Sequence, residues 1–422
     1  MVWPGGTYNN NGVTGGFSTE RDFANELTFN PDVNSQPVNV APGSGGVGGN
    51  IDLFTPDFKL PQVFKVNIAV DQKLPFWGLI ASADFVWNDN INAIFYENLN
   101  IAGPVGSLNG TDTRPFYSRN AIDPTYQRII LASNTGEGNS WNTSLTIRKP
   151  FSNGFQGQAS YSYGDANAIF DGTSSQNSSQ WRNIQTVNGK NSNIPVSTSD
   201  FSQGHRVNSF VSYEYKWNDN VKSTLGFYYE GVQGRPFSYI YAEGGTFNST
   251  DLLNDDSRDN ALIFIPAGPE DINLVDIVDG DGNVLTSAGQ QWVDLNNFIE
   301  GNEYLRERRG DYAERNGDRA SWSHVVDLKF LQDFSINVKG KKHTLQASVD
   351  IFNFTNLLNK DWGVRNFVNS SEVALISTES GGPNPEFQFD ASRFQNGIED
   401  VDDFGIQSSR WQAQIGLRYI FK

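Results

Sequence analysis

About nine segments of the chain alternate apolar and polar side chains residue by residue, the pattern of a β-strand whose two faces meet different surroundings. The clearest segment is the last, 410–422. One of its faces carries Trp411, Ala413, Ile415, Leu417, Tyr419 and Phe421. The other face carries Gln412, Gln414, Gly416 and Arg418, and Ile420 departs from the pattern. The remaining predicted strands are 64–72, 79–87, 139–148, 155–163, 206–217, 223–241, 325–334 and 344–353.

The connections between these strands are alternately very short and very long. Short turns are predicted at 73–76, 150–154, 218–220 and 337–341. Long polar loops are predicted at 88–138, 166–204, 243–321 and 355–408. Outer-membrane barrels join their strands in this way, with short periplasmic turns and long extracellular loops. A soluble sandwich or a β-helix also alternates, but it has no reason to carry all its long loops at one end.

The spacing therefore predicts an all-β fold, an antiparallel transmembrane outer-membrane β-barrel with long extracellular loops. If the short turns are periplasmic, the last strand ends on the periplasmic side and the strand count is odd. Bacterial single-chain barrels have even strand numbers, so we expect further strands upstream. We divide the chain into an extracellular loop segment at 1–60 and the C-terminal part of the barrel at 61–422.

Composition excludes several other classes. The mean hydropathy is -0.48 and no apolar run approaches the ~20 residues of a transmembrane helix, which excludes a helical membrane protein. The aromatic content of 13% fits the aromatic girdles of a barrel. A net charge of -17 argues against a nucleic-acid partner, because little in the chain would neutralise phosphates. The first residues show neither a basic region nor an apolar stretch, so no signal peptide is visible and we expect a missing front end.

Catalytic and metal-binding signals are sparse. The chain has no cysteine and only three scattered histidines, His205, His324 and His343. It contains no GxSxG, HExxH or Walker motif, so we expect no enzyme and no cofactor. Three carboxylates in 276–284 resemble part of a calcium loop, namely Asp276, Asp279 and Asp281. The distal glutamate of such a loop is missing, and DG and GN pairs are also ordinary hairpin turns.

Two features stand out in the longest loop. A capping box at Ser287 and Gln290 precedes Trp292, Leu295, Phe298 and Ile299 at helical spacing. This pattern predicts a short amphipathic helix around 288–300, packed on the barrel rim. The mixed-charge run at 306–311 could contact a ligand, or it could be a solvated loop with internal ion pairs.

Seven stretches in order resemble the C-terminal barrel half of Oar-like TonB-dependent receptors, which are common in the Bacteroidetes and related bacteria. They are RPFSYIY (235–241), NALIFIP (260–266), DINLV (271–275), QQWVDLNNFIE (290–300), YLRERRGDYAERNG (304–317), DIFNFTNLLNKDWG (350–363) and RWQAQIGLRYIFK (410–422). The similarity runs from about residue 61 to the C-terminus. It implies a 22-stranded barrel of the cell outer membrane, of which this chain is the last nine strands or so.

The resemblance also implies a function and partners. Such receptors take up a ligand across the outer membrane with energy from the TonB complex, reached through a TonB box on an N-terminal plug. This sequence shows no plug or TonB box, so we expect that contact to run through a plug absent from this chain. Trp411, Tyr419 and Phe421 match the signal read by the barrel-assembly machinery, although Lys422 follows the final aromatic residue.

Other partners and two other functions remain open at this stage. One of these functions is a soluble, secreted β-rich carbohydrate binder, which the Trp and Tyr content suggests and which would be soluble without detergent. The other alternative is an adhesin-like or secretion-linked barrel whose loops bind protein or polysaccharide. The expected partners are outer-membrane lipid and a surface lipoprotein, and the ligand is unidentified.

Overall fold

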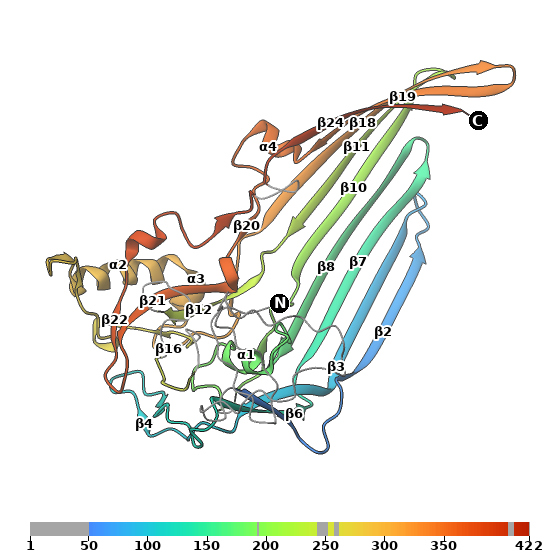
Figure 1. The fold of residues 1–422 in the computed structure, drawn as a ribbon. Coiled ribbons are helices and arrows are strands. Elements are labelled where there is room, and N and C mark those ends of the chain that lie inside the picture. Colours follow the sequence, from blue (N-terminus) through green and yellow to red (C-terminus); the bar gives the residue numbers. More distant parts are fainter. Residues whose placement is uncertain (1–49, 192–193, 243–251, 257–260, 404–408, 422) are drawn as a thin grey trace, which may run out of the picture.

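The fold is a tall, curved wall of antiparallel strands with a dense body of loops at one end, seen in Figure 1. The computed structural model describes residues 50–191, 194–242, 252–256, 261–403 and 409–421. The wall strands are β2 (Gln62–Lys73), β3 (Ile80–Asn98), β7 (Asn139–Ser152), β8 (Phe155–Ala168), β10 (Gly204–Lys216), β11 (Val221–Val232), β18 (Ser323–Val338), β19 (Lys341–Phe352) and β24 (Gln412–Phe421). Each pairs with the next in this order. The all-β architecture is confirmed. The described strands form an open wall, and closure into a barrel stays a prediction.

The tight turns fall at one end of the wall, where they were predicted. At the β7–β8 turn, Asn153 and Gly154 adopt φ of 52° and 81°, and at the β18–β19 turn Lys339 and Gly340 adopt 52° and 82°. Two positive φ angles in a row define the hairpin turn that matches strand twist, and they favour Asn and Gly. A Cβ on Gly154 would also lie 2.4 Å from the carbonyl oxygen of Glu214, so the turn has no room for a side chain.

The prediction of a single strand at 223–241 is wrong. β11 ends at Val232, and the chain then turns into β12 (Pro236–Ala242), which leaves the wall. The apolar pattern runs on through both strands, but every residue of β12 is buried on both faces. Pro236 lacks a backbone N–H and suits the first residue of a strand, which is where the chain changes sheet.

The long connections are not simple polar loops, contrary to the prediction. They pack together into one body, which we call the loop cap: the described residues between β3 and β7, β8 and β10, β11 and β18, and β19 and β24. Its central sheet has the order β17 (Asp318–Arg319), β12, β21 (Glu372–Ser380) and β22 (Glu386–Gln388). β6 (Arg128–Thr135) extends the wall by pairing with the far half of β3, and β1 (Asn50–Phe54) pairs in parallel with β6.

The smaller elements of the structure lie almost entirely in the cap. They are β4 (Gly106–Ser107), β5 (Pro115–Phe116), α1 (Asn177–Arg182), β9 (Ser197–Thr198), β13 (Phe264–Ile265), η1 (Pro269–Asp271), β14 (Ile277–Val278), β15 (Val284–Thr286), α2 (Ala288–Gly301), α3 (Glu303–Glu307), β16 (Asp311–Tyr312), α4 (Phe354–Leu358), β20 (Asn366–Phe367), η2 (Asn369–Ser371), η3 (Ala391–Phe394) and β23 (Asp400–Val401). No helix among the described residues is both long enough and apolar enough to traverse a bilayer.

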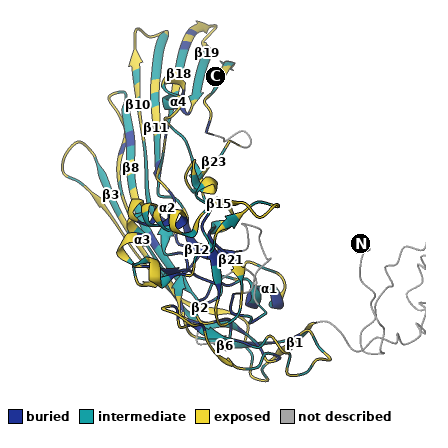
Figure 2. Cartoon of the chain, turned by 90° about the vertical axis from the view of Figure 1, so that its left-hand side faces the viewer, coloured by how far each residue is buried: buried dark blue, intermediate teal, exposed yellow. Residues whose placement is uncertain are grey.

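The largest hydrophobic core of the chain lies in the cap and not in the wall. Figure 2 shows the dark, buried segments gathered around β12 and β21, while the wall is mostly half-buried or exposed. Buried members of this core come from three of the four connections, for example Leu108, Ile263 and Leu375, and Val187 of the β8–β10 connection packs against them. Outside α2 and β12, the apolar residues of the cap core are scattered without strand or helix periodicity, which is why the sequence pattern did not reveal one shared core there.

The helix predicted around 288–300 is confirmed as α2. The Ser287 hydroxyl caps it by accepting a hydrogen bond of 3.3 Å from the backbone N–H of Gln290. Leu295 and Ile299 are fully buried in the core of the loop cap, so the helix packs there and not on the barrel rim as predicted.

The two faces of the wall differ as the alternation predicted. On β24, Ile415 is 82% exposed and Leu417 is 73% exposed, although both are large and apolar. Exposed apolar residues share this face on the other strands, among them Ile68, Leu145, Tyr213, Leu225 and Leu345. We call it the apolar face, and we call the opposite face, which carries Arg418 and its neighbours, the polar face. An apolar face of this extent suits contact with lipid.

The division of the chain at residue 60 stays a prediction. β1 lies within the predicted extracellular segment and pairs with β6 at the cap end of the wall. Residues 1–49 of that segment lie outside the described residues.

The two faces can be tested with neighbouring residues of β24. Leu417→Arg should abolish membrane assembly, because a cation on the lipid face costs roughly 2–4 kcal/mol at mid-depth. Arg418→Leu should assemble, because it leaves the apolar face intact. Assembly is measured by the heat-modifiable migration of the folded barrel on gels of outer-membrane fractions. If both variants assemble equally well, the proposed facing is wrong.

The core of the loop cap can be tested on α2. Leu295→Ala should destabilise the cap by roughly 2–5 kcal/mol, because it opens a cavity at a fully buried position. Limited proteolysis of assembled protein should then cut the cap while the wall strands stay protected. Val293→Ala, on the exposed side of the same helix, is the control and should leave the digestion pattern unchanged. Cleavage of wall and cap together would mean that the two do not unfold separately.

Candidate functional site

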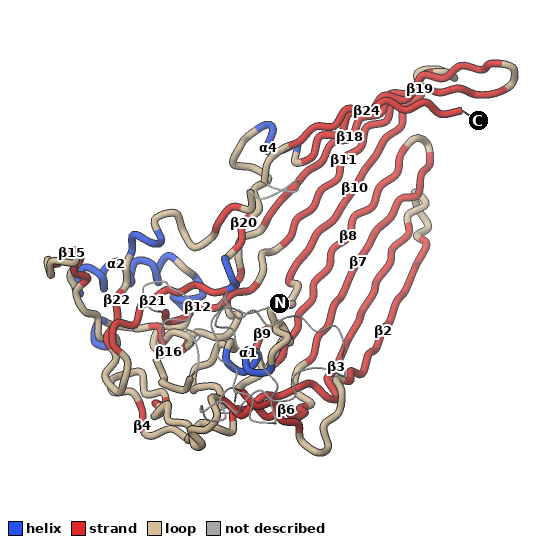
Figure 3. The backbone as a smooth tube through the Cα atoms, in the orientation of Figure 1, coloured by secondary structure: helices blue, strands red, loops and turns tan. Residues whose placement is uncertain are grey.

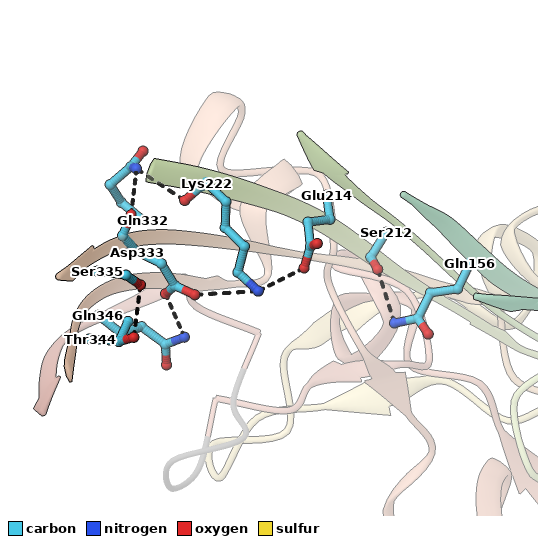
Figure 4. A network of polar contacts seen from close by, with 9 residues as sticks. All are labelled: Gln156, Ser212, Glu214, Lys222, Gln332, Asp333, Ser335, Thr344 and Gln346. Carbon is cyan, nitrogen blue, oxygen red and sulfur yellow. Dashed lines mark hydrogen bonds and ion pairs between the residues drawn. The ribbon is translucent and has the colours of Figure 1, made fainter. Parts of the chain in front are cut away.

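The polar face of the wall carries a network of charged and hydrogen-bonding side chains near the turn end, drawn in Figure 4. Lys222 Nζ lies 2.8 Å from Oε2 of Glu214 and 3.4 Å from Oδ2 of Asp333. Gln346 donates a 2.8 Å hydrogen bond to Asp333, so the network crosses from β10 to β19. The strand register produces it, because Lys222, Asp333 and Gln346 are directly paired across β11, β18 and β19. The polar face therefore suits an aqueous lumen.

Further pairs extend this polar lining toward the cap. Lys329 Nζ contacts Oδ1 of Asp350 at 2.6 Å in the middle of the wall. Glu230 accepts from two arginines, Arg206 of β10 at 2.6 Å and Arg365 of the loop cap at 3.2 Å. The second contact ties the cap to the polar face.

A hollow of about 440 Å³ lies on the wall between these charged groups. Its lining includes Phe210, Tyr228 and Phe352, three half-exposed aromatic side chains on the polar face, together with Thr224 and the ion pair of Lys329. Polar residues normally face the lumen of a barrel, so aromatic residues here depart from the alternation rule.

One buried arginine joins two connections of the loop cap. The guanidinium of Arg315 donates to the carbonyl oxygens of Ala168, Ile169 and Ser197. Burial lowers the pKa of Arg315. The next residue continues the join, since Asn316 Nδ2 donates to Thr198 O at 2.9 Å and to Asp200 at 2.7 Å. The sequence did not predict a structural role for Arg315 or Asn316, although both lie in the run 304–317 that carries the family resemblance.

Two tyrosines complete the polar interior of the cap. Tyr239 donates a 3.1 Å hydrogen bond to Asp318, and Asn302 donates to both of them. Burial raises the pKa of Tyr239. Burial also raises the pKa of Tyr304, to about 12, and its hydroxyl accepts a hydrogen bond from the backbone N–H of Glu314. Both hydroxyls therefore stay protonated at neutral pH.

The mixed-charge run at 306–311 makes internal contacts. Arg309 lies 2.8 Å from Glu300 and also donates to the carbonyl oxygen of Pro266. Arg308 lies 2.9 Å from Glu314, and Arg306 donates to the carbonyl oxygen of Glu300. These contacts fit the reading of a solvated loop with internal ion pairs.

The calcium candidates fall in the β14–β15 hairpin. Asp279 accepts hydrogen bonds from the backbone of Asp281 and Asn283 and so closes the turn. These hydrogen bonds lower the pKa of Asp279, the side-chain bond from Asn283 most of all. Asp276 points elsewhere and accepts from the backbone N–H of Ala288 at the start of α2. Across the described part of the chain, no group of three or more His, Cys, Asp or Glu is placed to hold a metal ion.

The proposed assembly signal lies along one face of the last strand. Tyr419 and Phe421 of β24 are 60% and 71% exposed, and Trp411, just before the strand, is half-exposed on the same face. All three belong to the apolar face. Recognition by the assembly machinery stays a prediction. Many other aromatic residues of the wall are also exposed, so exposure does not distinguish these three.

Comparisons with known proteins agree with this architecture. The family described as "Outer membrane beta barrel domain" matches residues 2–390. Among solved structures, the outer membrane transporter YddB from Escherichia coli matches with a TM-score of 0.35 and 10% identity, over 90% of this chain and 34% of the transporter. The chain thus spans about a third of that protein, and a likeness this distant carries no argument about function. No curated protein matches the sequence. The match over nearly the whole chain shows that the protein belongs to the outer membrane β-barrel domain family and resides in the outer membrane.

Proposed function

We propose that this chain is the C-terminal barrel portion of an Oar-like, TonB-dependent receptor that takes up an unidentified ligand across the outer membrane. The observation that carries the proposal is the wall itself: an apolar face for lipid, opposite a polar face with ion pairs, a hollow and a loop cap at the mouth. This arrangement fits a solute path through a wet lumen. It offers no constellation of nucleophile, base and oxyanion donors among the described residues, and we propose a transport role and not an enzymatic one.

The direction of the edge strands supports a larger barrel. β2 and β24 are the two edges of the wall, and because every neighbouring pair is antiparallel, the first and ninth strands run the same way. Antiparallel closure then requires an odd number of additional strands between them. A barrel of about 22 strands meets this condition. Unpaired backbone groups at the edges would be costly in lipid, so the edges need partners.

The partners follow from this proposal. Energy would come from the TonB complex through a plug that is not part of this chain, and a surface lipoprotein could dock on the loop cap. The barrel-assembly machinery would recognise β24 through Trp411, Tyr419 and Phe421. Sequencing the DNA upstream of Met1 tests the plug directly, since an in-frame extension encoding plug and TonB box is expected.

Energised transport can be tested with cysteine accessibility, since this chain contributes no cysteine to the background labelling and the unsubstituted complete gene product measures the rest. Thr224→Cys and Leu225→Cys place a thiol on the polar and the apolar face of β11 respectively. In cells producing the complete gene product, a membrane-impermeant maleimide should reach Cys at 224 faster when TonB is present than when it is deleted, because TonB opens the lumen. Cys at 225 is the matched control, which lipid should protect in both strains.

An adhesin-like or secretion-linked barrel predicts a different outcome. Its lumen would not depend on TonB, so labelling at position 224 would proceed equally in both strains. The packed loop cap favours this alternative, because it offers a folded surface on which a partner could bind. Equal labelling would refute energised uptake and leave binding by the cap as the function.

A further inference from the structure

All three histidines of the chain make the same contact with a tyrosine on the apolar face. His205 Nδ1 lies 2.7 Å from the Tyr161 hydroxyl, and His324 Nδ1 lies 2.9 Å from the Tyr229 hydroxyl. His343 pairs with Tyr419 in the same way at the other end of the wall. In each case the two residues lie on adjacent strands in diagonal register, with the histidine two positions from the direct partner of the tyrosine.

Trp322 joins two of these pairs into one aromatic stack at the cap end. Its ring lies 6.1 Å from that of His205 with 21° between the planes, and 5.9 Å from that of His324 with 5° between the planes. The stack therefore runs from Tyr161 on β8, through His205, Trp322 and His324, to Tyr229 on β11. We call these five residues the histidine belt.

From the turn end of the wall, the histidine belt lies toward the cap-side edge of the expected apolar band. The strand residues of the belt lie on the apolar face, where the next residues on the same face are two positions along each strand. These belt residues are Tyr161, His205, Tyr229 and His324. Along β8, eight residue steps lead from Phe155 at the turn end to Tyr163, which stacks on His205 at 4.3 Å. At about 3.4 Å per residue this is roughly 27 Å along the strand, or about 20 Å in height at a tilt of about 40°, so Tyr163 lies toward the cap-side edge of an apolar band about 25 Å tall.

The belt combines three aromatic rings with two imidazole rings on the apolar face. Arg319 is not one of its contacts among the described residues. It donates to the carbonyl oxygens of Ser202 and Gly234, near the cap ends of β10 and β11.

We propose that the histidine belt binds the phosphate group of a lipid in the outer leaflet. We assign each tyrosine hydroxyl as the donor to Nδ1, which places the ring proton on Nε2. Nε2–H then points away from the tyrosine as a hydrogen-bond donor. At this depth its acceptors are lipid headgroups and water, and the phosphate is the strongest acceptor among them. Trp322 holds the two imidazole rings at a fixed spacing.

The inference depends on the outer-membrane placement of the wall and not on transport. A barrel that only binds partners through its cap would still carry the belt, so failure of the TonB experiment would leave this proposal standing. Failure of the lipid experiment would likewise leave the transport proposal untouched.

The test measures lipid binding to the complete gene product extracted from outer membranes in dodecyl maltoside. Native mass spectrometry measures how much phosphatidylglycerol the protein retains. This amount is compared with the retained amount of a galactolipid that has the same acyl chains but no phosphate. The wild-type protein should prefer phosphatidylglycerol. The double variant His205→Phe/His324→Phe keeps the aromatic rings but removes both N–H donors, and should weaken phosphatidylglycerol binding by about tenfold or more.

His343→Phe is the matched control, since this histidine has the same tyrosine contact but no stacked tryptophan among the contacts of the described residues. It should bind phosphatidylglycerol as the wild type does. Heat-modifiable migration verifies that each variant is folded, and the comparison of two lipids on the wild type needs no variant. Equal retention of both lipids by the wild type would overturn the proposal, as would a double variant that binds normally or a control that loses as much binding.

Discussion

Backbone hydrogen bonding in lipid is the constraint on which this structure depends. A strand inside the hydrocarbon has no water to satisfy its N–H and C=O groups, so each strand must lie between two others. The wall meets this demand for all its interior strands with a simple meander, in which each tight turn brings the next partner alongside. The alternation of side chains follows from the same geometry, because a strand fixed between neighbours must present one face to lipid and the other to the lumen.

The loop cap obeys a different rule, since it is built as a small globular body in water. Its core residues come from segments far apart in the chain, and a buried arginine that donates to backbone carbonyl oxygens joins two of them. The ion pair between Arg365 and Glu230 then fastens the cap to the polar face. The described residues of the long connections therefore form one packed body at the cap end of the wall.

Much of the wall could be predicted from the sequence, and little of the cap could. Period-two alternation located all nine wall strands because each has one face in contact with lipid, and a serine followed by glutamine three residues later located α2. The break between β11 and β12 was missed because the apolar pattern continues through Pro236 into a buried sheet. The network around Lys222 was invisible because it depends on the register of three strands. Arg315 looked like one more charge in a charged run, since burial cannot be read from its neighbours.

The shared core of the cap has a consequence for the order of folding. Residues as distant as Leu108 and Phe389 meet in that core, so we expect most of the wall to pair before the cap is complete. Contacts of such long sequence separation form late, because the entropy of closing the intervening chain must be overcome beforehand. A completed cap is thus a sign that the strands beneath it are in register. An error anywhere along the wall would leave apolar cap segments exposed at the cell surface, where quality control or proteolysis could detect them.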